Sequence, residues 1–460
     1  QNSIMFQFLR SNASIPLIFM LVIWGLATFL FVQADIEPFY WELKNQLIGQ
    51  KLNEGFRMYQ DIRDNSGPLA AGFFQLLDAM SIPMSMNAYW ASGLIILQAF
   101  IFQRTIQRYE LMPPMGYLPF FIYAVFFHFS LEFIIPSAAL LGLTFLILAW
   151  QEIVKQQSTL NVDDRVFLIG LFIGAAGLCY PSYFLFIFWG ILSLVFYSGI
   201  NIRQMLLVLV GFLIINIITG LVYTYHGNFP YLIQVFQNSA IQFHAPAWEQ
   251  LKEIAWAYIP AFGFAIYGFW KVVENPKIKS TGQKAQQTNL IWIFTSIIAI
   301  FTLPATSSNN VLFFLPALAY FSLNSFFLLK KYWIREMMLW LMLAMTYFSL
   351  QWDWKLQENK RIKASEISLR NEKLMVLGPQ IEAYRYNQMS GPFVNWELSK
   401  SIFNELDQFK TIVLLDQYMT QDPPTYIYDP TGKFKRMQNY LPYLRVRYKE
   451  TSKHLYKRVI

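Results

Sequence analysis

Apolar runs long enough to cross a membrane recur along the first 352 residues of this chain, with short polar segments between them. The first run, residues 15–32, contains no charged side chain. A transmembrane helix needs about 20 predominantly apolar residues. The pattern therefore predicts a polytopic α-helical membrane protein of about eleven transmembrane helices. The later runs are residues 86–102, 115–127, 134–150, 166–180, 183–196, 205–222, 254–270, 290–303, 311–329 and 337–350.

Lysine and arginine residues gather in alternate connections between the predicted helices. Cytoplasmic loops of membrane proteins carry an excess of these residues, so the pattern predicts a cytoplasmic N-terminus. The loop after the first helix and the whole C-terminal segment are then extracytoplasmic. We expect a multi-pass protein of the cell inner (cytoplasmic) membrane. The basic residues assigned to the cytoplasmic side are Arg10, Arg104, Arg108, Lys155, Arg165, Arg203, Lys271, Lys277, Lys279, Lys284, Lys330, Lys331 and Arg335.

The pattern changes after Trp352. Residues 353–372 are polar and predict a helical connector, and residues 373–460 contain short apolar runs separated by turns. Such runs are typical of strands, so we expect a small extracytoplasmic α/β domain. The predicted domains are thus a transmembrane domain (1–352) with a first external loop (33–85), the connector, and the α/β domain. Expected strands are 374–377, 411–415, 425–428 and 444–448, with a helix over 396–409.

Composition agrees with this class of protein. Hydrophobic residues make up 55% and aromatic residues 18% of the chain, more than is usual in soluble domains. The net charge of +8 lies in short loops and the C-terminal tail, which favours membrane topology over nucleic-acid binding. The single cysteine, Cys179, excludes a disulfide within the chain. The sequence contains no phosphate-binding glycine loop and no Cys/His metal spacing, which argues against a nucleotide-driven pump.

The first external loop carries the strongest candidate chemistry. Asp35 and Glu37 directly follow the first apolar run, so two carboxylates are held at the membrane surface. Residues 38–52 have apolar positions at helical spacing and predict a helix lying on the membrane surface, and residues 69–80 predict a second interfacial or re-entrant piece. Charged and aromatic residues are mixed between them: Arg57, Tyr59, Asp61, Arg63 and Asp64. Acidic residues also end spans simply to stay hydrated, so this simpler interpretation stays open.

This loop resembles a known family. The acidic pair is followed by Gly55-x-x-x-Tyr59-x-Asp61 and then by Asp64-Asn-x-x-Pro68-Leu. The arrangement is similar to the first external loop of the GT-C glycosyltransferases, in the branch of the aminoarabinose transferase of lipid A and the protein O-mannosyltransferases. It covers about the first seventh of the chain. That family more often has adjacent acidic residues, and usually has Pro-Pro-Leu where this chain has Gly67-Pro68-Leu69.

The resemblance implies inverting glycosyl transfer from a polyprenyl-phosphate sugar to a glycan, lipid or protein acceptor on the extracytoplasmic face. Asp35 is then the expected base for the acceptor hydroxyl, with Glu37 orienting the acceptor or a divalent metal. Glu132, in the turn after the third predicted helix, matches an acidic position of the family and joins these catalytic candidates. The family's late external segment commonly carries an Arg or His, which Ser307–Asn310 lacks. A cation for the donor phosphate is then expected among Arg57, Arg63 and Lys252.

Histidines supply further candidates. His128 precedes Glu132 by four residues, so the two could share a helical face and hold a metal together with Asp35 and Glu37, although one His and one Glu are a weak ligand set. Metal dependence is therefore left open. The external segment 225–253 contains His226, His244 and aromatics that could cover a donor sugar or form an ordinary interfacial belt. The substrate-binding candidates are Arg57, Tyr59, Asp61, Arg63, Asp64, His226, His244 and Lys252.

Two other classes of function stay open. A lipid-linked glycan transporter or flippase would more often show internal repeats and charged residues at mid-membrane, and neither is evident here. A catalytically silent subunit of a larger cell-envelope assembly is consistent with the altered Gly67-Pro68-Leu69 motif. Membrane lipids are expected partners, because residues 433–458 hold nine basic residues and a single acid, Glu450. A solvated charged face explains the same run.

Overall fold

The computed structural model describes residues 4–459 except 12, 35–37, 159–161, 243–247, 275–278, 304–308, 330, 359–366, 368 and 401. Asp35, Glu37 and His244 therefore lie outside the described residues. The chain divides into two compact units. We call Gln1–Ile36, Ser85–Val222 and Phe236–Asn359 the membrane unit, and Glu37–Met84, Tyr223–Val235 and Lys360–Ile460 the loop–sheet unit.

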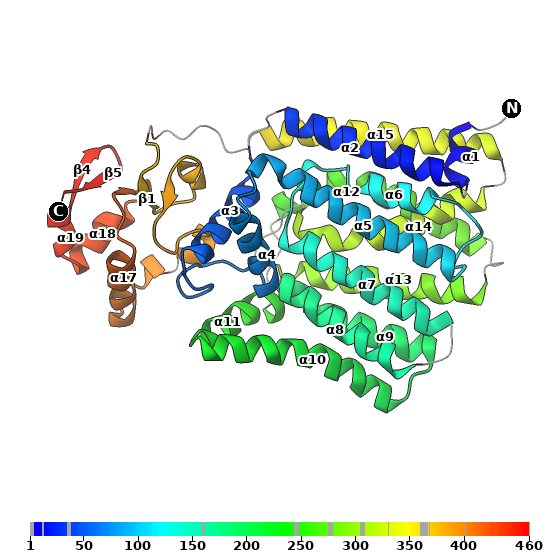
Figure 1. Ribbon diagram of the computed structural model, residues 1–460, viewed down its shortest axis with the longest axis horizontal. Coiled ribbons are helices and arrows are strands. Elements are labelled where there is room, and N and C mark those ends of the chain that lie inside the picture. Colours follow the sequence, from blue (N-terminus) through cyan, green and yellow to red (C-terminus); the bar gives the residue numbers. More distant parts are fainter. Residues whose placement is uncertain are drawn as a thin grey trace. The chain divides into compact units, whose positions relative to one another are not determined.

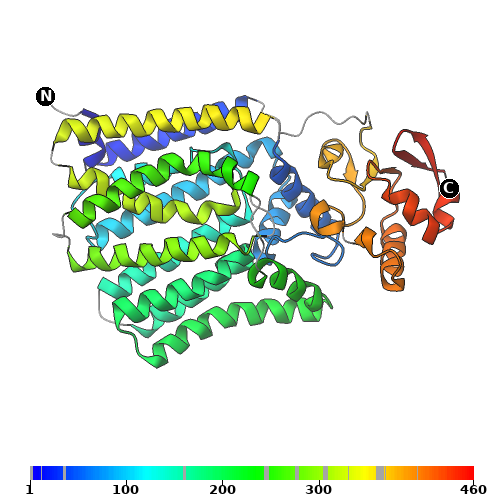
Figure 2. The same cartoon turned by 180° about the vertical axis from the view of Figure 1, so that it is seen from behind.

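The membrane unit is a bundle of long helices that run roughly parallel to one another (Figures 1 and 2). Within it α7 packs along α8, and α12 along α14. Its α-helices are α1 (Ile4–Arg10), α2 (Ser14–Gln33), α5 (Asn87–Arg108), α6 (Leu118–Phe126), α7 (Ala138–Ser158), α8 (Asp163–Cys179), α9 (Phe186–Ser198), α10 (Ile202–Tyr225), α12 (Trp248–Glu274), α13 (Ser280–Ile300), α14 (Leu315–Leu328) and α15 (Tyr332–Glu358). Short 3₁₀ turns η1 (Met84–Met86), η2 (Leu131–Ile134), η3 (Pro181–Leu185) and η5 (Asn309–Phe314), and the π turn η4 (Gln237–Ile241), connect them.

Five helical stretches in the described part of the chain are long and apolar enough to cross a membrane. They are Ser14–Gln33, Met84–Arg108, Ala138–Ser158, Pro181–Ser198 and Ile202–Tyr225. In the first and last of these only 17% of the apolar window is buried, as expected for helices that face lipid. These features confirm a helical multi-pass membrane protein. Each predicted run overlaps a helix, but the count of about eleven spans stays a prediction.

Helix packing in the membrane unit depends on close backbone approach. A Cβ atom at Gly170 of α8 would lie 1.9 Å from the carbonyl oxygen of Val208 in α10, and one at Gly211 of α10 would lie 2.1 Å from that of Phe167. Only glycine fits at such a distance. Small residues at facing positions are the usual device by which membrane helices approach closely.

The loop–sheet unit combines most of the predicted first external loop with the C-terminal segment. Its loop helices are α3 (Tyr40–Asn53) and α4 (Pro68–Ala79), and most of α11 (Phe229–Phe236) joins them. A mixed five-stranded sheet has the order β2-β1-β3-β5-β4. The strands β1 (Lys373–Val376), β2 (Gln388–Met389) and β3 (Tyr426–Tyr428) are parallel, whereas β5 (Leu455–Arg458) is antiparallel to β3 and to β4 (Tyr448–Ser452). The helices here are η6 (Ile381–Tyr384), α16 (Trp396–Ser399), η7 (Ile402–Asn404), α17 (Phe409–Gln421), α18 (Lys433–Tyr440) and α19 (Tyr443–Arg447).

The expected small C-terminal sheet is present, but two of its predicted strands are wrong. Residues 374–377 and 425–428 correspond to β1 and β3. Residues 411–415 lie in the helix α17, because its buried positions Thr411, Leu415, Tyr418 and Met419 recur at helical spacing. Residues 444–448 mostly form α19. The predicted helix over 396–409 is interrupted and forms only α16 and η7.

The first loop helix differs from its expected setting. A helix over 38–52 is confirmed as α3, but its apolar side chains Phe39, Leu43, Leu47 and Ile48 are at most 3% exposed. They are buried where α3 packs against α4 and η6, so this face is covered by protein rather than by lipid. By contrast, α4 leaves Leu69, Leu76 and Met80 exposed, as an interfacial helix would.

Candidate functional site

The segment between α3 and α4, residues 54–67, folds into a compact loop that we call the 54–67 loop. The amides of Asp61 and Ile62 donate to the carbonyl of Arg57, at 2.9 and 3.2 Å, and the amide of Tyr59 donates to that of Ile62 at 2.9 Å. Tyr59 has a φ of 71°, a left-handed conformation that bulky residues rarely adopt. A non-glycine residue held in this conformation is a common feature of functional loops.

Tyr59 is fixed by its surroundings. Its side chain is buried, and its hydroxyl donates to the carbonyl of Ser66 at 2.8 Å. Its ring centre lies 5.7 Å from that of Tyr223. Burial, with Tyr223 and Asp64 nearby, raises the pKa of Tyr59 well above its ordinary value. Tyr59 therefore acts as a neutral, structural anchor of the loop rather than as an acid or base near neutral pH.

A buried ion pair holds the end of the loop. The Nζ of Lys44, in α3, lies 2.7 Å from Oδ1 of Asp64, and both side chains are at most 3% exposed. The Nδ2 of Asn395 donates to the same oxygen at 3.2 Å, and the amide of Ser66 donates to Oδ2 at 2.9 Å. Burial alone would raise the pKa of Asp64, but Lys44 and Ser66 outweigh it and hold that pKa below its ordinary value. Asp64 is thus a buried carboxylate paired with Lys44, and its expected part in substrate binding stays a prediction.

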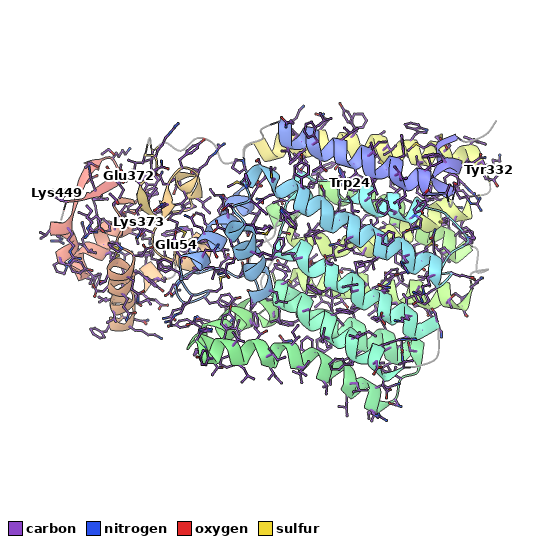
Figure 3. All side chains as sticks on the ribbon, viewed as in Figure 1. Trp24, Glu54, Tyr332, Glu372, Lys373 and Lys449 are labelled. Atoms are coloured by element: carbon purple, nitrogen blue, oxygen red, sulfur yellow. The ribbon has the colours of Figure 1, made fainter. Side chains whose placement is uncertain are left out.

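A second buried cluster ties α3 to the C-terminal segment. The Nζ of Lys51 lies 2.9 Å from Oδ2 of Asp422 and 2.8 Å from Glu54, and Lys373 contacts the other oxygen of Asp422. Figure 3 labels Glu54 and Lys373. Burial would raise the pKa of Asp422, but Lys373, Lys51 and the amide of Gly391 hold it below its ordinary value. These contacts therefore hold α3 and the start of the 54–67 loop against the C-terminal segment.

The loop presents two arginines. The side chain of Arg57 is exposed and donates to the carbonyl of His226 at 3.4 Å. The half-buried Arg63 is held by its amide, which donates to Pro392 at 3.0 Å. The Nε of Arg63 is buried without a hydrogen-bond partner in the described part of the chain. The Arg63 side chain also interacts with Tyr418, so Nε is the donor that is left without a partner. Because a buried donor without a partner is costly, this atom is suited to an anionic ligand.

The other described substrate-binding candidates are Asp61, His226 and Lys252. Asp61 is half-buried, and its Oδ2 accepts from the amide of Arg57 at 3.0 Å, so it closes the turn. His226 is exposed and stacks edge-on against Tyr225 at 5.3 Å. Lys252, in the membrane unit, is exposed. The structure thus gathers Arg57, Tyr59, Asp61, Arg63, Asp64 and His226 in the loop–sheet unit.

A separate carboxylate group lies in the membrane unit. Glu132 is 4% exposed in η2, and Asp353, near the end of α15, is 5% exposed. The Oδ2 of Asp353 accepts from Oγ of Ser130 at 3.0 Å and from the amide of Leu131 at 2.8 Å. Asp353 therefore fixes the turn that carries Glu132. A buried carboxylate in a membrane protein is costly and commonly functional.

His128 does not share a helical face with Glu132, because residues 127–130 interrupt the helix between them. Its Nδ1 lies 3.2 Å from the carbonyl of Ala124, and its ring centre lies 4.2 Å from that of Trp24. Among the described residues, no three His, Cys, Asp or Glu side chains form a group that could hold a metal. Two of the four suggested ligands, Asp35 and Glu37, lie outside those residues.

Four residues of these clusters were missed by the sequence analysis. Lys44 and Lys51 lie seven residues apart on either side of the buried Ile48, so a helical projection would have placed both on the apolar face of α3. Asp353 stands between Trp352 and Trp354 at the end of the last predicted span, where a carboxylate among interfacial aromatics is a usable signal. Nothing in the sequence around Asp422 indicates that it pairs with Lys51.

Solved structures establish the class of fold. The aminoarabinose transferase ArnT from Cupriavidus metallidurans, solved bound to undecaprenyl phosphate, matches with a TM-score of 0.62 and 10% identity over 96% of this chain and 98% of that one. The archaeal oligosaccharyltransferase AglB from Archaeoglobus fulgidus, in complex with an inhibitory peptide and a dolichol-phosphate, gives a TM-score of 0.47 and 12% identity over 94% and 72% of the two chains. The protein thus has the GT-C fold that its first loop predicted.

The sequence also matches a family model. Residues 70–353, more than half of the chain, match the family of unknown function DUF6427, and the protein belongs to it. A search of the curated proteins found no match.

Proposed function

We propose that this protein is an integral membrane glycosyltransferase that moves a sugar from a polyprenyl-phosphate donor to an acceptor at the extracytoplasmic face. The observation that carries the proposal is the 54–67 loop within a GT-C fold. This loop presents the exposed Arg57 and the unsatisfied Nε of Arg63. Both are guanidinium donors suited to a phosphate. The ArnT structure, which has this fold, was solved with undecaprenyl phosphate bound.

The proposed reaction is a displacement at the anomeric carbon of the donor. The acceptor hydroxyl oxygen forms the new glycosidic bond, its proton passes to a carboxylate, and the bond from the anomeric carbon to the phosphate oxygen breaks with its electron pair leaving on the phosphate. Asp35 is the proposed base, with Glu37 and Glu132 orienting the acceptor. Arg57 and Arg63 stabilise the negative charge that develops on the departing polyprenyl phosphate.

The purified full-length protein, supplied with polyprenyl-phosphate sugars and a membrane-lipid extract as acceptor, tests the proposal. Release of polyprenyl phosphate together with a glycosylated product supports it. Asp35→Asn keeps the size of the side chain but removes proton acceptance, so turnover should fall by roughly a hundredfold or more. The matched control is Lys400→Gln, since Lys400 forms an exposed pair with Glu397.

One result would overturn the enzyme assignment, and another would overturn the assignment of the base. Movement of the lipid-linked sugar across proteoliposomes without release of polyprenyl phosphate would identify a flippase. Undiminished turnover in Asp35→Asn would remove this residue as the base and leave Glu132 as the carboxylate to test next.

A further inference from the structure

A cavity of about 650 Å³ lies at one end of the membrane unit, far along the helices from Glu132. Glu132 lies in η2, shortly before the start of α7 at Ala138, whereas Lys155 and Ser158 line the cavity from the last turns of that helix. A helix of this length spans about 30 Å. The cavity therefore belongs to the opposite end of the unit, where the sequence places the basic loops.

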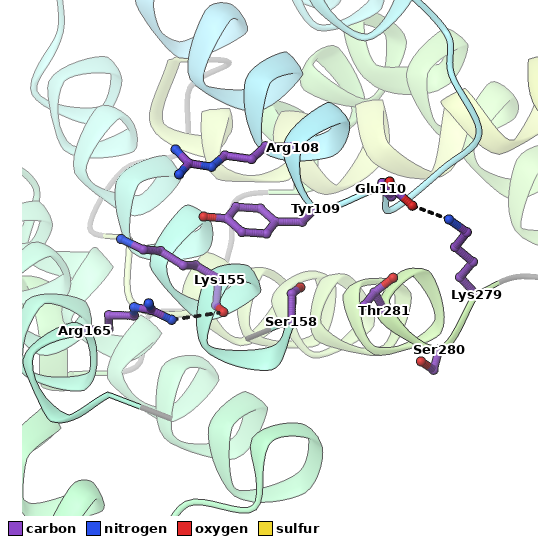
Figure 4. A pocket seen from close by; sticks show the side chains of 9 residues that line it. All are labelled: Arg108, Tyr109, Glu110, Lys155, Ser158, Arg165, Lys279, Ser280 and Thr281. Carbon is purple, nitrogen blue, oxygen red and sulfur yellow. Dashed lines mark hydrogen bonds and ion pairs between the residues drawn. The ribbon is translucent and has the colours of Figure 1, made fainter. Parts of the chain in front are cut away.

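Four basic side chains and a single acid line this cavity, which we call the basic cavity (Figure 4). Arg108, Lys155 and Arg165 lie on one side of it, and an ion pair between Lys279 and Glu110 lies on the other. These side chains come from the ends of α5, α7, α8 and α13 or from the residues next to them, so three separate parts of the sequence meet at the cavity. The lining residues have a net charge of +3, from four cations and one carboxylate.

Several of these cations are held in place while still facing the cavity. The Nη1 of Arg165 donates to the carbonyl of Lys155 at 3.5 Å, and Lys155 contacts Glu152 at 3.2 Å. Arg108 has no hydrogen-bond or ion-pair partner among the described residues, and its guanidinium carbon lies 6.0 Å from the ring centre of Tyr109. An arginine so placed can bind a phosphate with two parallel hydrogen bonds.

The start of α13 adds backbone donors. Ser280 and Thr281 line the cavity at the first two positions of this helix. The first amides of a helix have no partner within it, and they carry the positive end of the helix dipole. They add to the attraction of the four cations for a phosphate.

An apolar cavity of about 720 Å³ adjoins the basic cavity, because Lys279 and Glu110 line both. Its walls include Ile106, Leu111 and Met112. Asn324 also lines it. This side chain is 1% exposed, and neither its Nδ2 nor its Oδ1 has a partner in the described part of the chain. A buried amide without partners is costly, so a polar group of a ligand is expected to satisfy it.

We propose that the two cavities together bind an anionic membrane phospholipid. The phosphate lies among Arg108, Lys155 and Arg165, an ester carbonyl accepts from Nδ2 of Asn324, and an acyl chain fills the apolar cavity. Basic pockets between transmembrane helices bind such headgroups because their cations meet the phosphate at the membrane surface. A free phosphate ion would use the same cations, but it would leave Asn324 and the apolar walls without a partner. This site is separate from the 54–67 loop and does not depend on the proposed reaction.

Native mass spectrometry of the delipidated full-length protein in a neutral detergent tests this site. Phosphatidylglycerol should bind with one tight site, and phosphatidylcholine, which has no net charge, should not. The double variant Arg108→Gln, Arg165→Gln should weaken phosphatidylglycerol binding by roughly tenfold or more. Arg104→Gln is the matched control, because Arg104 is exposed on α5 and lies outside the residues that line either cavity. The Arg104→Gln variant should bind phosphatidylglycerol as tightly as the wild type does.

Two further measurements separate a lipid from a soluble anion. Asn324→Leu should weaken phosphatidylglycerol binding, because it removes the polar group from the apolar cavity, and leave any binding of inorganic phosphate unchanged. Inorganic phosphate that binds with no retention of phosphatidylglycerol would overturn the lipid assignment. Equal phosphatidylglycerol binding by the double variant and the wild type would overturn the site itself. If the double variant fails to fold, Arg108→Gln alone gives the same comparison at an exposed position.

Discussion

Lys51 and Asp422 form a buried ion pair, with 2.9 Å between Nζ and Oδ2, across 371 residues of sequence. Lys51 belongs to the first external loop, and Asp422 directly follows α17 in the C-terminal segment. With the hydrogen bond that Asn395 donates to Asp64, the pair makes the loop and the C-terminal segment parts of one folded unit. The sheet therefore has a clear role, since it supports the loop that presents Arg57 and Arg63.

The first prediction concerns the stability that this support supplies. Asp64→Asn removes the charge that compensates the buried Lys44. Removing one partner of a buried pair costs about 3–5 kcal/mol, so the melting temperature of the purified protein should fall by roughly 5–15 °C. The exposed pair of Lys400 and Glu397 provides the control, because Lys400→Gln should change stability by less than about 1 kcal/mol.

The double variant Lys44→Met, Asp64→Leu gives a sharper test of the same pair. Replacing both partners with apolar groups removes the unpaired charge, so its melting temperature should lie above that of Asp64→Asn. A double variant that is no more stable than Asp64→Asn would contradict this account of the pair.

The second prediction follows from the lowered pKa values of Asp64 and Asp422. In the unfolded chain these carboxyls take up protons near their ordinary pKa of about 3.9, while in the folded protein they resist protonation. Their contribution to stability is therefore complete above the ordinary pKa and is lost as the pH falls through the folded one. The melting temperature should therefore start to fall below about pH 5 and keep falling as the pH drops below the ordinary pKa.

A variant of Asp422 tests whether this acid sensitivity comes from the paired carboxyls. The acid-induced fall should be shallower in Asp422→Asn than in the wild type, and Glu397→Gln should keep the wild-type profile. Identical profiles in all three proteins would assign the acid sensitivity to other groups.

Local patterns were enough to predict part of the fold. Uninterrupted apolar runs such as 15–32 became helices, and the first-loop motif predicted the GT-C fold that the ArnT match establishes. The C-terminal segment was harder, because Ile412 to Leu415 look like a strand when only β-propensity is counted. Buried neighbours around α17 select the helix instead, as its spacing of buried residues shows.

The candidate site could also be predicted only in part, because a sequence does not show which distant residues pair on folding. Arg57 and Arg63 became candidates because charge in a predicted external loop is visible in sequence, and their roles stay predictions. The pairing of Asp64 could not be predicted, since a carboxylate in this loop looks the same in sequence whether it binds a ligand or a buried lysine. Its partner Lys44 lies 20 residues away, and only the folded unit shows that both are buried.

The third prediction concerns topology. Cys179 is buried, so a membrane-impermeant thiol label should report only on a newly introduced cysteine. Three crossings are predicted between positions 277 and 433. A cysteine at Lys277 should be labelled only from the cytoplasm and one at Lys433 only from outside. Labelling of both from the same side would overturn the odd number of crossings.

The last prediction separates the two arginines of the 54–67 loop. Arg57 is exposed, so it is placed to meet the donor phosphate on arrival, whereas the unsatisfied Nε of the half-buried Arg63 is fixed in position. Under the proposed reaction, Arg57→Gln should mainly raise KM for the polyprenyl-phosphate sugar, and its effect should weaken at high salt because exposed charges are screened. Arg63→Gln should mainly lower kcat, by roughly a hundredfold, because a fixed donor stabilises the charge that develops on the leaving phosphate.

Lys400→Gln, at an exposed position outside the basic run 433–458, is the control for a lost surface charge and should leave both constants unchanged. Steady-state kinetics of the four proteins at two salt concentrations measure the difference. If Arg57→Gln and Arg63→Gln behave alike, the two guanidinium groups share one role. The assignment of donor binding to Arg57 and of charge stabilisation to Arg63 is then wrong. If neither differs from Lys400→Gln, the loop does not bind the donor phosphate, and the cation must be sought in the membrane unit, beginning with Lys252.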